Sequence, residues 1–330
     1  MKFRHTTRCR LTAVFTLFLP GIESAASEAM PRMPALERLL ARGRARPLGS
    51  SPWDFLAAHA GGDTRRWPVG PVSALGELGT APRACLRVEP LGADAEQQGL
   101  FRLPATILEI TRVEAGALAT AFRETFDEDG LRLEIAVPER WYLAWNEDHA
   151  NAKPWQGFAG PASSMREGDR PAPAEAGLRR LLSEIEMLFH GHPVNAARRE
   201  RGLPTIAGLH AWGGGVLSPG EAPAATGSSA IEEPYLAGLR RLAALPHVAA
   251  ARTKRDAIGA GGVAWPLPFE TLDPRQMASI ELEWAAPLLS MLRRGRLDGV
   301  RVVTGRAIHE TRRTDALRIW RRARPVVDLC

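Results

Sequence analysis

The stretch from residue 184 to residue 215 holds the side chains most suited to binding an anion. It reads EIEMLFHGHPVNAARRERG at 184–202 and WGGG at 212–215. Asn195 stands where a helix N-cap is expected, and the free amides of that helix start, together with Arg198 and Arg201, suit a phosphate. The glycines of the second motif could let further backbone amides approach the same ligand. Equally, Asn195 could only cap the helix, and the glycines could only turn the chain.

Two histidines, His190 and His192, lie where the preceding helix is expected to end. Imidazole is a frequent zinc ligand, but this pair straddles a helix terminus and lacks an obvious third ligand nearby. Histidines at a helix C-terminus also interact favourably with the helix dipole. We therefore predict no metal ion at this position.

The elements that position these residues follow from hydrophobic periodicity. An amphipathic helix is expected over 174–190, followed by a short helix over 195–201 and a strand over 205–212. Upstream, Thr111 and Glu114 predict a capping box at the start of another helix.

The rest of the chain reads as strands and helices in alternation, which favours an α/β fold. Strands are expected at 11–19, 85–91, 105–110, 131–137, 140–145, 300–304 and 316–320. Helices are expected at 34–43, 52–59, 235–244 and 274–294, the last interrupted at Pro287. Loops are expected at 61–83, 147–173 and 217–230.

Composition describes an ordinary globular protein with a basic balance. The 330 residues are 45% hydrophobic and 24% charged, which argues against large-scale disorder. Net charge is +6, and only three of the 43 basic residues are lysines, so arginine supplies nearly all the positive charge. The three cysteines, Cys9, Cys85 and Cys330, form no disulfide framework or CxxC pair, which fits a reducing compartment.

The N-terminus has two interpretations. Basic residues precede an apolar run at 11–19, and Ala25, Ala26 and Ser27 follow it, which is typical of a secretory signal within residues 1–29. The same run is short and rich in β-branched and aromatic residues, and Pro20 and Gly21 stop it, as expected of a buried parallel strand. We favour the strand, and with it a cytoplasmic protein that is not inserted in a membrane.

Several of these segments resemble RpfE-type regulatory proteins, whose core reads NEIQMLLHxHPVNxxR and then NSLWLWGGG. The resemblance extends in patches over nearly the whole chain, at 11–21, 34–43, 86–126, 140–143, 178–215, 282–289, 295–296 and 320–322. The central block is also similar to the inserted domain of archaeal-type cofactor-independent phosphoglycerate mutases, and the start resembles the alkaline-phosphatase superfamily.

This resemblance implies an α/β fold with a mostly parallel sheet flanked by helices, an alkaline-phosphatase-like core, and a smaller inserted α+β subdomain. The core would comprise 1–83 and 216–330, and the insert 84–215. An anion or phosphate site would then draw on His190, His192, Asn195, Arg198, Arg201, Trp212, Gly213, Gly214 and Arg140.

The departures from the related enzymes bear on catalysis. Those enzymes end their first strand with a metal-binding aspartate, where this chain has Pro20 and Gly21. They carry a late Asp-His pair and a further His, whereas the late candidates here are Asp298, His309 and Asp315, in no such pattern. Ser50 and Ser51 follow the first helix, but nothing nearby in the sequence looks like an activator of a nucleophile. The chain also departs from the regulatory family at Ser183, Glu186, Ala207 and His210.

Three hypotheses follow. The first is a non-catalytic regulatory protein that binds a phosphorylated small molecule, and its other expected partner is a regulatory protein. The second is an active phosphoglycerate mutase or phosphotransferase, which would need Mn²⁺ or Zn²⁺. The third is a basic nucleic-acid-binding protein.

The third hypothesis rests on the C-terminal arginines. Eleven arginines lie between residues 293 and 324, against three acids. Such a stretch could contact phosphates, but no helix-turn-helix, zinc or RNA-binding signature accompanies it. We expect instead a solvated face or arginines paired with acids.

Overall fold

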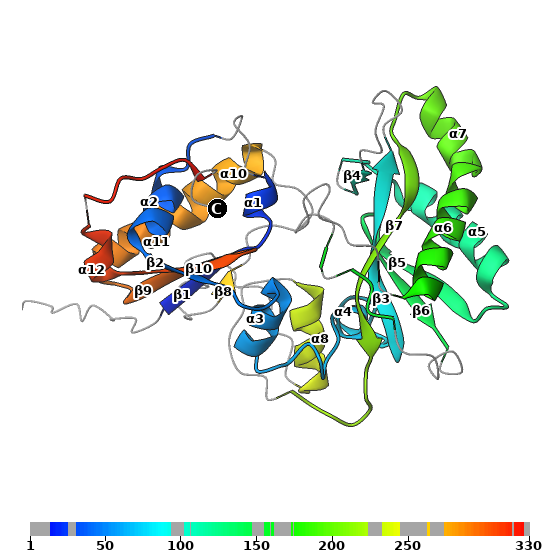
Figure 1. Cartoon of the computed structure of the whole chain (residues 1–330), viewed down its shortest axis with the longest axis horizontal. Coiled ribbons are helices and arrows are strands. Elements are labelled where there is room, and N and C mark those ends of the chain that lie inside the picture. The colour runs from blue at the N-terminus through cyan, green and yellow to red at the C-terminus, as the bar shows by residue number, and fades with distance from the viewer. Residues whose placement is uncertain are drawn as a thin grey trace, which may run out of the picture.

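The computed structural model describes residues 14–25, 31–93, 102–146 apart from 106, 155–161 apart from 159, 173, 175–223, 233–244, 263–264 and 274–326 apart from 319. These residues form a mixed α/β structure with two sheets (Figure 1). In this described part, no helix has the length and apolar character needed to cross a bilayer.

The first sheet combines strands from the two ends of the described chain, in the order β2-β10-β9-β1-β8. β1 (Val14–Leu19) is parallel to both its neighbours, β9 (Gly299–Thr304) and β8 (Val263–Ala264). β10 (Ala307–Arg312) pairs antiparallel with β9, and β2 (Arg44–Pro47) pairs antiparallel with β10 at the sheet edge. The predicted parallel arrangement is therefore limited here to β1 and its two neighbours.

Helices from both ends of the chain cover one face of this sheet. They are α2 (Pro34–Arg42), α10 (Pro274–Ile280) and α11 (Ala286–Arg293), and a π-helical turn at Glu281–Ala285 joins the last two. Phe15 of β1 stacks on Trp284 of that turn, with ring centroids 6.3 Å apart. Two short helices, α1 (Ile22–Ala25) and α12 (Arg313–Ala316), complete this unit.

A second group of helices lies between the two sheets: α3 (Pro52–His59), α4 (Val69–Leu78) and α8 (Pro234–Leu242) (Figure 1). One continuous apolar cluster links all three helices to both sheets; its members include Phe18 and Val303 of the first sheet and Trp212 of the second. α4 and α8 approach very closely where Gly76 faces Gly238. A Cβ atom on Gly76 would lie 1.9 Å from the Pro234 carbonyl oxygen, and one on Gly238 would lie 1.8 Å from the Val72 carbonyl oxygen.

The second sheet is antiparallel and uses one continuous part of the chain. β3 (Ala84–Ala93) pairs along one edge with β7 (Thr205–Val216). Along its other edge it pairs with β6 (Arg140–Trp145) and β4 (Arg102–Pro104). β5 (Leu131–Val137) pairs with β6. Two amphipathic helices, α5 (Arg112–Phe126) and α6 (Ala176–His190), pack on this sheet through a common apolar core, and α7 (Pro193–Glu200) follows α6.

The structure confirms most predicted elements, including the capping box at Thr111 and the interruption beside Pro287. Residues 61–83 were predicted as loop, which is wrong because α4 lies within them. The predicted strand at 105–110 is also wrong: its described residues form a turn, with the Leu108 amide bonded to the Ala105 carbonyl at 3.1 Å. The strand predicted at 316–320 is wrong because α12 and a turn at Asp315 occupy its start. β2 and β10 were not predicted.

Several predicted segments fall partly outside the described residues. Residues 1–13, which hold the basic half of the possible signal sequence, are among the undescribed residues, whereas 14–19 form the predicted buried strand. Most of the predicted loops at 147–173 and 217–230 are likewise outside the described part.

Candidate functional site

The predicted anion-binding stretch forms the corner between α6 and α7 and the start of β7. α6 buries Leu178, Leu181, Leu182, Ile185 and Phe189 against the second sheet, as its periodicity predicts. The helix ends at His190, and the chain turns through Gly191 into α7. This corner presents one flank of α6 to β7 and brings the ends of both helices together.

The N-cap of α7 is His192, so the prediction that Asn195 has this role is wrong. The His192 Nδ1 atom accepts a hydrogen bond from the Val194 amide at 3.2 Å. Pro193 follows at the first helical position. Proline suits this position because its fixed φ matches the helix and the N–H that it lacks would have no partner within the helix. Asn195 therefore lies within the first turn of the helix, and its side chain is used elsewhere.

Asn195 joins the end of α6 to the start of β7. Its side chain is 1% exposed. Nδ2 donates to the carbonyl oxygens of Phe189 at 2.7 Å and Ile206 at 2.8 Å, and Oδ1 accepts the Ile206 amide at 2.8 Å. The Asn195 side-chain nitrogen and oxygen atoms thus both have backbone partners, and these bonds fix the geometry of the corner.

Arg198 is fully buried and is held from several sides. Nε donates to the Pro204 carbonyl at 2.7 Å, Nη1 lies 3.1 Å from each carboxylate oxygen of Glu114, and Nη2 donates to the Leu108 carbonyl. This guanidinium connects α7 to the start of α5 and to the turn before it. Its contacts explain why residues 105–110 turn instead of forming a strand.

Glu114 forms ion pairs with both arginines of this corner, Arg198 and Arg201. It completes the capping box with Thr111, and it also pairs with Arg201 at 2.7 Å. Burial raises the pKa of this carboxyl group, but hydrogen bonds from Thr111 and Arg201 and the charge of Arg198 outweigh it and bring the pKa down to about 2. The carboxylate is therefore ionised throughout the physiological range and holds two arginines in place.

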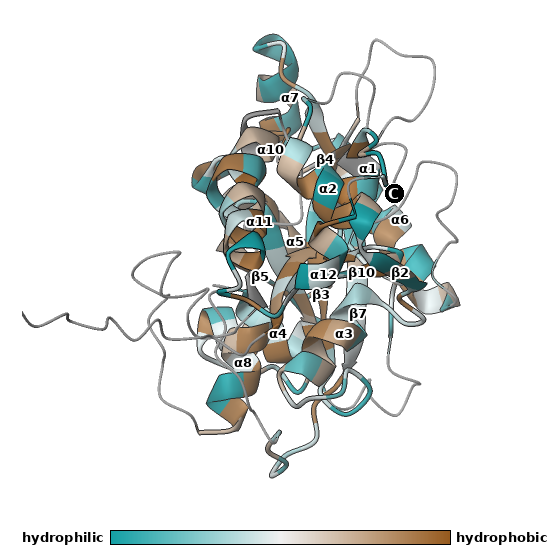
Figure 2. Ribbon diagram, turned by 90° about the vertical axis from the view of Figure 1, so that its left-hand side faces the viewer, coloured by the Kyte–Doolittle hydropathy of each residue, from teal (hydrophilic) through white to brown (hydrophobic). Residues whose placement is uncertain are grey.

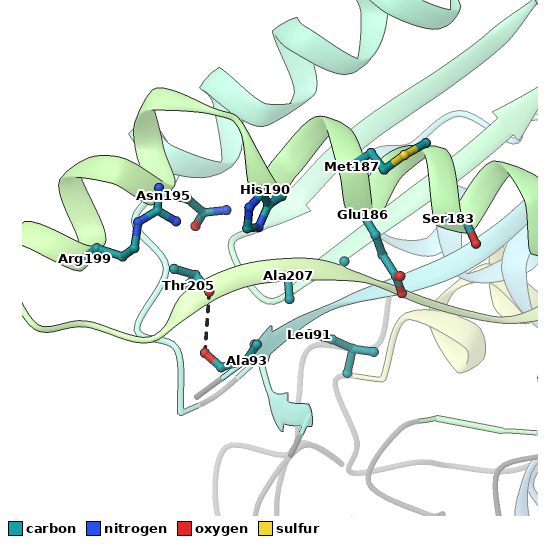
Figure 3. Close-up of a pocket in the computed structure, with 12 residues that line it drawn as sticks. Leu91, Ala93, Ser183, Glu186, Met187, His190, Asn195, Arg199, Thr205 and Ala207 are labelled. Atoms are coloured by element: carbon teal, nitrogen blue, oxygen red, sulfur yellow. Dashed lines mark hydrogen bonds between the residues drawn. The ribbon is translucent and has the colours of Figure 1, made fainter. Parts of the chain in front are cut away.

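A groove of about 520 Å³ runs between α6, α7 and the strands β3 and β7 (Figure 3). Figure 3 shows Glu186 and His190 on the side of α6 that faces β7, with Arg199 of α7 at one end of the groove. The polar lining comes from Ser183, Glu186, His190, Asn195, Arg199 and Thr205, and the apolar lining includes Leu91, Met187 and Ala207. Arg199 is exposed and forms no ion pair within the described part of the chain.

Two of the nine predicted site residues, His190 and Asn195, line this groove. Arg198 and Arg201 lie at the same corner but turn toward Glu114. Sequence reasoning missed Arg199, Met187 and Thr205 as groove residues. The signal was present, because positions 183, 186, 187 and 190 share one side of a helix at spacings of three and four residues.

The glycines after Trp212 continue β7 rather than forming a loop. A Cβ atom on Gly214 would lie 2.2 Å from the Trp155 carbonyl oxygen, and one on Gly213, whose φ is +65°, would lie 2.9 Å from the Val69 Cβ. The Gly214 amide donates to the Gln156 carbonyl at 3.0 Å. These positions need glycine because neighbouring segments pack directly on the strand backbone.

Trp212 belongs to a buried polar cluster on the opposite side of the second sheet from α5 and α6. Its Nε1 donates to Glu89 at 2.8 Å, and the Arg87 guanidinium lies 5.0 Å from its ring centroid. Arg87 also pairs with Glu233 at 2.9 Å, and both side chains are at most 5% exposed. Glu233 in turn caps α8 through the Tyr235 amide, so the ion pair joins β3 to α8.

Arg140 lies apart from the other predicted site residues. Its guanidinium pairs with Glu77 of α4, and the Tyr142 hydroxyl donates to the same carboxylate at 2.8 Å. Burial raises the pKa of Glu77, but the Arg140 hydrogen bonds outweigh it, so the net pKa is lowered. This group links α4 to β6.

The late acids and histidine do not converge. His309 is buried beside the Leu40 carbonyl, which lies 3.4 Å from its Nδ1, and burial lowers its pKa. Asp315 accepts the Arg312 amide and pairs with Arg318 at 2.9 Å. Within the described residues, no group of three or more His, Cys, Asp or Glu side chains is placed to hold a metal ion.

No protein-family model and no curated protein matches the chain. Among solved structures, it is similar to a cofactor-independent phosphoglycerate mutase from Thermoplasma acidophilum DSM 1728, with 18% identity, 91% of this chain and 90% of that chain covered, and a TM-score of 0.37. It is also similar to the PH0037 protein from Pyrococcus horikoshii, with 13% identity, 91% and 87% coverage, and a TM-score of 0.40. Both TM-scores lie below 0.5, so any assignment of function rests on the residues of this chain.

Proposed function

We propose that this chain is a non-catalytic, phosphoglycerate-mutase-like regulatory protein of the RpfE type, which acts by binding a small phosphorylated molecule. In this proposal an alkaline-phosphatase-like core, made of residues 1–83 and 216–330, carries an inserted subdomain at 84–215. Two sheets of different origin support the division. The first takes its strands from both ends of the chain, and the second uses only residues from 84 to 216.

The observation that carries the binding proposal is the groove beside α6, where His190 and Arg199 lie on a rigid frame. Arg199 supplies a guanidinium, which matches the geometry of a phosphate. His190 can donate a further hydrogen bond, and Ser183 and Thr205 add hydroxyl groups along the wall. The volume of about 520 Å³ falls in the range typical of small-molecule sites.

The frame of the groove is set by residues that were predicted to touch the ligand. Asn195 fixes the corner from inside, and Arg198 ties α7 to α5 through Glu114. Since their polar atoms are occupied by the protein, these two residues position the groove and leave Arg199 and His190 to contact the anion. A preorganised site of this kind loses little conformational entropy when a ligand binds.

The residues after β1 do not fit a metal-dependent phosphotransfer centre. Pro20 and Gly21 follow the strand, and the next carboxylate in the chain is Glu23. Both Glu23 oxygens accept backbone amides at 2.9 Å, one from Gly305 and one from Arg306. Each oxygen of this carboxylate accepts a backbone amide in the turn between β9 and β10, which supports a structural role for Glu23 other than Mn²⁺ or Zn²⁺ catalysis.

A titration of the purified protein with phosphoglycerates and other phosphorylated metabolites, followed by calorimetry and thermal shift, tests this function. A ligand at about one hundred times its dissociation constant adds about 2.7 kcal/mol to the free energy of unfolding, which raises the melting temperature measurably. Arg199→Glu should abolish the shift, because it places a carboxylate where the phosphate would bind.

Arg123→Glu is the matched control, since Arg123 is an exposed helical arginine on α5 outside the groove. It should retain ligand binding. Equal binding by wild type and Arg199→Glu would refute the groove as the site. Mutase turnover that depends on added Mn²⁺ or Zn²⁺ would refute the non-catalytic part of the proposal.

A further inference from the structure

The arginines at the far end of the first sheet gather on one surface, which we call the arginine face. There α2 and α11 end, α12 lies across them, and β2 forms the sheet edge (Figure 1). Figure 2 views the molecule from this side and shows hydrophilic residues on α12 and β2. The exposed arginines of these segments are Arg44, Arg46, Arg293, Arg294, Arg296, Arg312, Arg313, Arg321, Arg322 and Arg324.

Specific contacts bring these segments together. Arg321 Nη1 donates to the Gly43 carbonyl at 3.0 Å, which places the segment after α12 beside the start of β2. Arg42 Nη1 donates to the Ala316 carbonyl at 2.8 Å, which joins the end of α2 to the end of α12. The Arg313 guanidinium lies against Gly295, just after α11, where a Cβ atom would come within 3.0 Å of it. The arginine face is therefore a single surface built from segments far apart in the sequence.

Acidic side chains neutralise only part of this charge. Glu310 pairs with Arg301 and Arg312, and Asp315 pairs with Arg318. The other exposed arginines of the arginine face have no ion pair within the described chain. Burial lowers the pKa of Arg42, and the charges of Arg293 and Arg38 lower it further, which shows that the cations lie close enough to repel one another.

Helix dipoles account for some of these arginines but not for all. Arg42 and Arg293 stand in the last turns of α2 and α11, where positive charge is favourable. Arg44 and Arg46 lie on an edge strand, and Arg322 and Arg324 follow α12 without being in a helix. These four gain nothing from a helix terminus, so a separate reason is needed for their concentration on one surface.

An exposed aromatic side chain lies among the same cations. Trp320 is 74% exposed, and Arg321 and Arg322 follow it directly. Leu317, one turn earlier in the sequence, is 66% exposed. An exposed indole beside arginines in the chain can hold an unpaired base by stacking while the arginines neutralise the neighbouring phosphates.

We propose that the arginine face binds single-stranded nucleic acid. Arg44, Arg46, Arg322 and Arg324 contact backbone phosphates, and Trp320 stacks on a base. Recognition is through charge and stacking, so it favours single strands over duplexes and has little sequence preference. This inference does not depend on the small-molecule groove, which lies beside the second sheet.

The test is fluorescence anisotropy with a short, labelled, mixed-sequence single-stranded oligonucleotide, titrated with the full chain at several salt concentrations. Wild-type affinity should fall steeply between about 50 and 200 mM salt, because bound phosphates release counterions. Arg322→Glu with Arg324→Glu should weaken binding at least tenfold and flatten the dependence on salt, and Arg44→Glu with Arg46→Glu should do the same. Trp320→Ala should weaken binding about fivefold or more, within the range of one lost stacking contact. It should also reduce the quenching of the protein's tryptophan fluorescence by the bound oligonucleotide.

The matched control is Arg123→Glu with Arg132→Glu, which changes the net charge equally but lies on α5 and β5 of the second sheet. It should bind the oligonucleotide within about twofold of wild type. Equal losses in the control and in the arginine-face variants would overturn the proposal, because binding would then follow net charge alone. Affinity that is independent of salt, or stronger for duplex than for single strand, would overturn it as well. Circular dichroism of each variant confirms that the fold is retained.

Discussion

The guanidinium of Arg198 lies within 3.1 Å of both carboxylate oxygens of Glu114, and this pair joins two helices that are far apart in the sequence. The arginine side chain is fully buried and the glutamate side chain is 10% exposed. Removing Glu114 would leave the buried guanidinium without a counter-charge. Removing Arg198 would leave the Leu108 and Pro204 carbonyls without their donor, and Glu114 with Arg201 as its remaining cation. The corner of the groove therefore depends on this contact.

Arg198→Ala should lower the free energy of unfolding by about 3–5 kcal/mol, the range for breaking a buried ion pair. Urea denaturation followed by circular dichroism measures the change. Arg199→Ala is the control, because this neighbouring arginine is exposed and should change stability by less than about 0.5 kcal/mol. Similar values for the two variants would contradict the buried-pair interpretation.

Glu114 also predicts a dependence of stability on pH. Its pKa in the folded protein is about 2, against an ordinary value of 4.5. A depressed pKa contributes stability above the unfolded pKa, and that contribution is lost as the pH falls from about 5 to about 2. The difference corresponds to about 3 kcal/mol.

The measurement is the urea midpoint of wild type and Glu114→Gln over this pH range. The wild type should be more stable at pH 7, and its advantage should shrink steadily below pH 5. A stability difference that stays constant down to pH 2 would mean that the carboxylate charge does not hold the corner together.

Local signals in the sequence explain which elements could be predicted. Thr111 and Glu114 are three residues apart at the start of an apolar pattern, and the capping box forms as expected. α4 was missed because its glycines and Pro71 are typical of loops. Tertiary packing overrides that tendency, since the glycines of α4 allow close contact with α8 and β3.

The candidate site was less predictable because its partners are distant in sequence. The pattern at 190–201 correctly located a corner between two helices, but it could not show that Arg198 would turn inward to Leu108 and Glu114. Pro193 at the first helical position was a signal for His192 as the N-cap, and the prediction of Asn195 did not use it. Arg199, the next residue, lines the groove. Consecutive residues of a helix point in different directions, so Arg198 and Arg199 have different surroundings.

The close contact between Gly76 and Gly238 predicts that adding one methyl group at either position will destabilise the fold strongly. Gly76→Ala or Gly238→Ala should lower the free energy of unfolding by several kcal/mol, because the added atom would overlap backbone of the facing helix. Gly116→Ala is the matched control: Gly116 is also helical, has nothing within 4 Å of its Cβ position, and should gain up to about 1 kcal/mol. Thermal denaturation of the three variants gives the comparison. Equal behaviour at positions 76 and 116 would show that α4 and α8 are further apart than described.

Cys85 predicts a difference in thiol reactivity between the folded and unfolded states. The side chain is fully buried in β3, and burial raises its pKa well above the ordinary thiol value. Because only the thiolate reacts readily, a thiol reagent should modify this residue only when the protein unfolds.

The experiment uses a variant with Cys9→Ser and Cys330→Ser, so that one cysteine remains. Native protein should show negligible labelling over minutes, and denatured protein should be labelled completely. Rapid labelling under native conditions would show that β3 opens locally far more often than its central place in the sheet implies.

The arrangement of the first sheet has a consequence for synthesis on the ribosome. β1 precedes the second sheet in the chain, but the strands beside it, β8 and β9, are made only after the second sheet. The second sheet uses residues 84–216 alone and can assemble while the C-terminal part is still absent. The apolar residues of β1 are therefore exposed to non-native association until β8 and β9 have been synthesised. Chaperone demand should consequently be highest in the interval between completion of the second sheet and synthesis of β9.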